Sequence, residues 1–142
     1  MRRSLLPLGL MLALAACQPA SPPNATAPAA PTDFIYAELD IADLQARMQA
    51  GELDSRRLTQ AYLDRIAAVD KAGPQLNSVI ELNPDALKEA ALRDVERRAN
   101  AVRGPLHGIP VLLKDNIDAV PMVNSAGSLA LASHKPKADA FI

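Results

Sequence analysis

Lys114 is the residue whose type and position most clearly suggest chemistry in this sequence. It follows an apolar run, residues 109–113, which comes directly after a turn rich in glycine and proline. Such a run predicts a strand buried on both faces, so its terminal lysine would emerge at the sheet edge where α/β proteins bind ligands. In a dry site a lysine can act as a general base, because desolvation disfavours its ammonium form. The alternative is a solvated residue at a strand end with no catalytic role.

Short polar residues beyond the apolar run are candidates for supporting roles. Asp115 and Asn116 follow the predicted strand directly, where such side chains usually bond local backbone, so we expect them to shape the turn. Ser128 is placed to cap a short helix over residues 129–132. Ser128 and Ser125 are candidates for either a structural role or a contact with substrate.

Other catalytic arrangements find less support in the sequence. His107, His134 and Asp139 supply the residue types of a serine protease triad, but a triad is recognised by geometry, and these positions carry no signature of one. His107 also lies within the glycine and proline turn. The sequence contains no cluster with metal-ligand spacing, and we expect neither a metal nor another cofactor.

The elements that must position these residues follow from the spacing of apolar residues. We predict a short helix capped by Asp40, a longer helix capped by Ser55, a strand over residues 78–82 and a third helix opened by Asn83-Pro84. With the strand over 109–113, this order predicts an α/β fold. The residues expected on the buried helix faces are Ile41, Leu44 and Met48, then Leu58, Tyr62, Ile66 and Val69, then Leu87, Ala91 and Val95.

Residues 104–116, which read GPLHGIPVLLKDN, and the Ala-Gly-Ser at 126–128 together resemble the amidase signature family. The resemblance extends over about residues 40–142. It implies an α/β fold, the N-terminal part of a mixed sheet covered by helices, which is incomplete in this chain. It also implies hydrolysis of a carboxylic amide, in a small molecule or a peptide, by a lysine, a serine in a cis peptide bond and a nucleophilic serine. Lys114 aligns with the catalytic lysine.

Two departures from the family pattern affect this interpretation. Asn124-Ser125 stands where the family often has a pair of threonines, which would alter the substrate pocket. Neither the cis serine nor the glycine- and serine-rich nucleophile segment lies in residues 115–142. We therefore expect a fragment that holds only the lysine part of the mechanism and is inactive by itself. The alternative is a non-catalytic exported lipoprotein, or a truncated product without the nucleophile.

The N-terminal residues are typical of an exported lipoprotein. Residues 1–16 read as a signal peptide, with two arginines followed by an apolar stretch. Cys17 directly follows Leu-Ala-Ala, a pattern that resembles a bacterial lipobox and predicts lipidation of the thiol. Residues 17–32 are rich in proline and alanine and carry no charge, which predicts a tether before the amidase portion at 33–142. We expect the bacterial cell envelope as the location, facing the periplasm, with membrane contact through the lipid alone.

The charge of the chain excludes one class of partner. Losing Arg2 and Arg3 with the signal peptide changes the formal net charge from −1 to −3, and no basic stripe remains. Nucleic acid is therefore not an expected partner.

The predicted lipid anchor is tested at Cys17. Metabolic labelling with a fatty-acid analogue should tag the protein, and Cys17→Ala should abolish the tag, because the thiol is the attachment point. Labelling that is unchanged in the variant would contradict the prediction.

Overall fold

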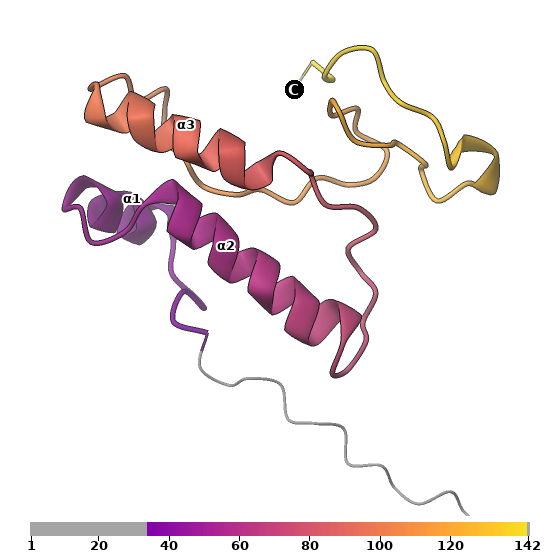
Figure 1. The fold of residues 1–142 in the computed structure, drawn as a ribbon, viewed down its shortest axis with the longest axis horizontal. Coiled ribbons are helices and arrows are strands. Elements are labelled where there is room, and N and C mark those ends of the chain that lie inside the picture. The colour runs from indigo at the N-terminus through magenta and orange to yellow at the C-terminus, as the bar shows by residue number, and fades with distance from the viewer. Residues whose placement is uncertain (1–33, 142) are drawn as a thin grey trace, which may run out of the picture.

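The computed structural model describes residues 34–141, so the predicted signal peptide, Cys17 and the tether lie outside the described residues. Within these residues, three α-helices follow one another: α1 (Ile41–Gln49), α2 (Ser55–Arg65) and α3 (Ala86–Arg98). The last turn of α2 widens into a π-helix, η1 (Ile66–Lys71), and a single 3-10 turn, η2 (Leu129–Leu131), follows much later. Residues 99–141 continue largely as loops, with η2 at the end of the molecule opposite α1 (Figure 1). None of the helices within 34–141 has the length and apolarity to cross a bilayer.

The first two helices begin where aspartates accept the free backbone N–H groups of the first turn. Asp40 caps α1 as predicted, and its carboxylate accepts the N–H of Asp43 at 2.8 Å. The cap of α2 is Asp54, which accepts the N–H of Arg57 at 2.6 Å, and the prediction of Ser55 was wrong by one residue. Ser55 is instead the first helical residue.

The core forms where α1 and α2 meet the segment that precedes them. Leu44 and Met48 from α1 pack with Leu58 from α2, and Tyr36 and Leu53 complete the cluster. These three helical residues were predicted to face the core, which is confirmed, whereas Ile41 is largely exposed. The apolar faces of both helices therefore join through a small set of aliphatic contacts.

A buried carboxylate joins α3 to the beginning of α2, along which α3 packs (Figure 1). Asp94 accepts the N–H of Ser55 at 2.7 Å and that of Arg56 at 3.1 Å, which satisfies two donors that no helical carbonyl can reach. The inward face of α3 consequently carries Asp94 and Ala90. The prediction that Val95 faces the core was wrong, since its side chain is 52% exposed.

The two predicted strands are not present as strands in residues 34–141. Residues 78–82 form no regular secondary structure. Asp70 accepts the N–H groups of Ser78 and Val79, so a side chain occupies donors that a neighbouring strand would use. Lys71 bonds the carbonyl of Val79 at 2.5 Å. The segment is thus tied to the end of η1 and pairs with no strand in the described part of the chain.

Residues 109–113 likewise form no strand, and their predicted burial was wrong. Leu112 is 76% exposed, and Val111 and Leu113 are exposed as well. An apolar run becomes a buried strand only where neighbouring strands accept its backbone bonds and cover its faces, and residues 34–141 supply no such neighbours. Of the predicted α/β fold, residues 34–141 show the helices and none of the strands.

Gly108 is the point of closest approach between the loop after α3 and α2. Its φ is +79°, and a Cβ at this position would lie 2.0 Å from the Oγ of Ser55. That hydroxyl is buried and has no hydrogen-bond partner. Only a residue without a side chain fits here, for both conformational and steric reasons.

Gly108→Ala should lower the free energy of unfolding by more than about 2 kcal/mol, through positive φ and the steric clash together. Ser55→Ala should change it by less than about 1 kcal/mol, because the lost hydroxyl makes no bond. Thermal unfolding of both variants and the double variant tests this. The double variant should recover only part of the loss, since φ stays positive; full recovery would show that the clash is the whole cost.

Candidate functional site

A turn at residues 104–109, which we call the histidine turn, precedes Lys114 in the chain. The buried imidazole of His107 bonds this turn to α3. The Nδ1 of His107 accepts the N–H of Arg103 at 3.3 Å, and Nε2 lies 2.9 Å from the carbonyl oxygen of Arg93. A carbonyl only accepts, so the ring proton belongs on Nε2 in this arrangement. The imidazole is 0% exposed. It anchors the turn to the last turns of α3.

The backbone of the histidine turn is held as well. Gln45 of α1 donates to the carbonyl of Pro105 at 2.7 Å and to that of His107 at 3.0 Å. Arg97 of α3 donates to the same His107 carbonyl at 3.0 Å and to the side-chain oxygen of Gln45 at 2.7 Å. Residues from two helices therefore converge on one carbonyl, which fixes the path of the chain toward Lys114.

A cluster of charges surrounds the turn on its outer side. Glu96 accepts from Arg93 at 2.9 Å and from the Nε of Arg103 at 2.9 Å, and it lies 3.9 Å from the Nδ1 of His107. The hydrogen bond from Arg103 is the main cause that holds the pKa of Glu96 below its ordinary value, against the opposing effect of desolvation. The cluster keeps this carboxylate ionised and ties residue 103 to α3.

Lys114 follows residues 109–113, which form no strand, and its side chain is exposed. Within residues 34–141 no carboxylate oxygen lies within 4.0 Å of its amine. The dry surroundings expected for a lysine base are therefore not supplied by the described part of the chain. What this part supplies is an amine free of a direct ion pair.

The neighbouring carboxylate of Asp115 is occupied by a turn farther along the chain, residues 125–128, which we call the serine turn. Asp115 accepts the hydroxyl of Ser125 at 2.5 Å and the N–H of Gly127 at 3.2 Å. Its backbone carbonyl accepts the N–H of Ala126 at 3.0 Å. The hydrogen bond from Ser125 is the main cause that lowers the pKa of Asp115, followed by opposing desolvation and then the two backbone donors. Asp115 therefore joins both ends of the intervening loop.

The structure thus brings together two of the residues singled out in the sequence, Asp115 and Ser125, and Lys114 adjoins Asp115 in the chain. Asn116 is exposed in the turn after Lys114. Ser128 precedes η2 as predicted, but its side chain makes no capping bond, because η2 is a single 3-10 turn.

The residues of the disfavoured triad serve other contacts. The ring of His107 is bound to α3, as described above. Asp139 accepts the N–H of Val120 at 2.8 Å, and His134 is exposed, with its backbone carbonyl accepting from Asn124. These three side chains therefore have separate environments, and the triad gains no support from their geometry.

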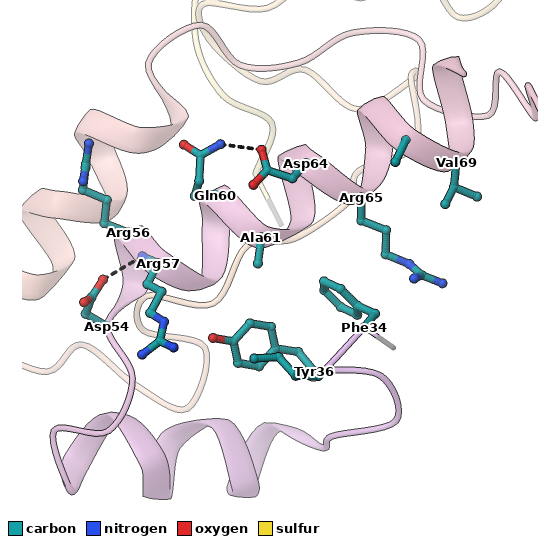
Figure 2. A pocket seen from close by; sticks show the side chains of 12 residues that line it. Phe34, Tyr36, Asp54, Arg56, Arg57, Gln60, Ala61, Asp64, Arg65 and Val69 are labelled. Carbon is teal, nitrogen blue, oxygen red and sulfur yellow. Dashed lines mark hydrogen bonds between the residues drawn. The ribbon is translucent and has the colours of Figure 1, made fainter. Parts of the chain in front are cut away.

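A separate open pocket of about 640 Å³ lies along α2, away from the residues singled out in the sequence. Its floor is formed by Phe34, Tyr36 and Ala61, and the guanidinium groups of Arg57 and Arg65 flank it (Figure 2). Arg65 lies over the ring of Phe34, 4.8 Å from its centre. None of the predicted site residues lines this pocket.

Sequence reasoning missed the side chains that position the histidine turn. These side chains, Gln45, Arg97 and Glu96, bond residues in the loop after α3, namely His107 and Arg103. Their spacing on the helices is that of ordinary solvent-facing residues, so it did not indicate these bonds. The sequence held one partial indication of these bonds. The arginines at the end of α3 lie close in sequence to His107.

Comparisons with known proteins converge on one family. The family profile described as Amidase matches residues 57–142. The native peptide amidase from Stenotrophomonas maltophilia is 72% identical, with a TM-score of 0.72, over 73% of this chain and 21% of that chain. A Schizosaccharomyces pombe protein named as an amidase is 41% identical over 103 residues, 72% of this chain and 17% of that protein.

A further relative carries the name of an amidotransferase. This protein, the glutamyl-tRNA(Gln) amidotransferase A chain of Levilactobacillus brevis, is 36% identical over 107 residues, 75% of this chain and 21% of that protein. The chain therefore spans about a fifth of the length of the relatives it matches.

The charge cluster around the histidine turn predicts a pH-dependent stability. Since the pKa of Glu96 is lowered on folding, its ionised form stabilises the fold fully above about 4.3, the ordinary glutamate value, and less as the pH falls through its folded pKa. Glu96→Gln should therefore lower the melting temperature at pH 7, and the difference should shrink below about pH 4. Melting curves from neutral to acidic pH test this; a difference that is constant over the range would contradict it.

Proposed function

This chain belongs to the amidase family, and on that premise we propose that it forms the N-terminal part of a peptide amidase in which Lys114 is the general base. Family membership supports hydrolysis of a carboxylic amide in general terms. The proposal that Lys114 is the general base depends on one observation. Its amine has no carboxylate partner within residues 34–141, although an aspartate is its neighbour in sequence. A lysine base must be able to lose its proton, and an ion pair would oppose this.

The proposed reaction uses a serine nucleophile activated by the lysine. The neutral amine of Lys114 takes the proton of a bridging serine, which in turn takes the proton of the nucleophilic serine as it attacks the amide carbonyl. The proton then passes to the leaving amine, and water releases the acyl group as a carboxylic acid. The resemblance to the amidase signature family implies that both serines come after residue 142.

A peptide amide is the substrate class we favour. The support is the 72% identity to a peptide amidase, well above the 36% identity to the amidotransferase chain. We also retain as a proposal that the enzyme is exported and held at the membrane through Cys17, because a signal peptide would remove it from cytoplasmic tRNA. Residues 17–32 would then keep the catalytic part clear of the lipid surface.

Lys114→Ala in the full-length gene product should reduce turnover of a peptide amide by at least about a hundredfold with little change in KM, because general-base catalysis typically contributes that much. Lys114→Arg should fail similarly, since a guanidinium stays protonated. Ammonia release under saturating substrate gives the measurement.

His134→Ala provides the matched control, since the side chain is exposed and has no role in the proposed reaction. It should retain most of the activity. Near-normal turnover in Lys114→Ala, or loss of turnover in a well-folded His134→Ala protein, would overturn the proposed mechanism.

A further inference from the structure

Asp115 lies between the proposed base and the serine turn, and all of its observed side-chain bonds are made to that turn. Its carboxylate accepts from the Oγ of Ser125 at 2.5 Å, from the N–H of Ser125 at 3.4 Å and from the N–H of Gly127 at 3.2 Å. Its carbonyl accepts from Ala126. One residue thus bonds three consecutive residues that lie ten or more positions away.

The serine turn has a conformation that needs such an anchor. Ala126 has a φ of 47° and Gly127 a φ of 72°, so two successive residues adopt the left-handed region, which an alanine rarely occupies. Their N–H groups converge on the main chain and side chain of Asp115. The carboxylate of Asp115 itself accepts from the hydroxyl and the N–H of Ser125 and from the N–H of Gly127, whereas the N–H of Ala126 bonds the backbone carbonyl.

We infer that Asp115 is a positioning residue of the amidase reaction: it fixes the serine turn beside Lys114, while the turn's donors occupy its carboxylate and keep it from pairing directly with the lysine. This inference rests on the proposed function, in which Lys114 must release its proton. A free carboxylate next to the lysine would stabilise the ammonium form. Bonds from one hydroxyl and two N–H groups offset the same negative charge.

Three other carboxylates bond residues of the loop at 116–124. Asp118 accepts from the side-chain amide of Asn124 at 2.5 Å, and Glu81 accepts the N–H of Val123 at 2.8 Å. Asp139 accepts the N–H of Val120. The lysines that follow Lys114 within the described residues are Lys135 and Lys137. Asp115 differs from the other three carboxylates because it alone adjoins Lys114 in sequence and has Lys114 among the charges that lower its pKa.

The inference predicts opposite effects for two variants of the full-length gene product, measured as kcat/KM for a peptide amide against pH. Asp115→Asn removes the negative charge, so Lys114 should deprotonate more easily. The acid limb, the part of the profile in which kcat/KM rises with pH, should therefore move to lower pH by about 0.5 unit or more. The rate at the optimum should also fall about tenfold or more, because an amide NH2 replaces one of the two oxygens that accept from the serine turn.

Ser125→Ala keeps the charge but removes its hydroxyl donor, so the carboxylate attracts the ammonium more strongly. The acid limb should then move to higher pH. A residue that only stabilised the fold would change the rate without shifting the limb in opposite directions. Asp139→Asn is the matched control, because it removes a negative charge from a residue that bonds the same loop but does not adjoin Lys114, and it should leave the limb in place.

Limbs that stay unchanged in both variants, or move in the same direction, would overturn the inference. Should Asp115→Asn not fold, as judged by circular dichroism, the direction of the shift in Ser125→Ala decides alone. Failure of the proposed function is distinguishable, because Lys114→Ala would then retain turnover. An inactive Lys114→Ala protein together with unshifted limbs refutes only the role of Asp115.

Discussion

The imidazole of His107 connects the helical part of the chain to everything that follows it. The ring bonds the carbonyl of Arg93 and the N–H of Arg103. The backbone carbonyl of His107 accepts from the side chains of Gln45 and Arg97. Losing a ring partner would leave a buried polar atom unpaired, at a cost of about 1–3 kcal/mol. The direction in which the backbone leaves α3 is therefore set by this side chain, and the segment that ends at Lys114 inherits that direction.

The parts of the fold that depend on local chemistry could be predicted from the sequence, and the parts that depend on distant partners could not. Asp40 and the apolar spacing of Leu44 and Met48 suffice for α1, because a cap and a helical face lie within a few residues. The cap of α2 was misplaced by one residue because Asp54 and Ser55 are adjacent and both are residue types that cap helices, and it is Asp54 that accepts from Arg57. An apolar run such as 109–113 predicts burial but says nothing about which segment covers it.

The candidate site divides in the same way. The motif around Lys114 could be read directly, and it led to the family that the comparisons support. The bond between Asp115 and Ser125 could not be predicted, because it closes a loop across ten positions beside two residues with positive φ. The cluster of Glu96 and Arg103 was hidden for a similar reason, since both residues read as ordinary surface charges.

Because η1 is a π-helical turn, the number of residues in Ile66–Lys71 determines which side chains that follow it face one another. The N–H of Ala72 bonds the carbonyl of Ala67, five residues back, where an α-helix would use the residue one position nearer. Each α-helical residue turns the chain by about 100°, so removing one residue here would restore regular winding and rotate Asp70 away from Ser78. A relative one residue shorter at Ile66–Lys71 would need an alignment gap placed within the helix, and residues matched across it by letter would not be equivalent in space.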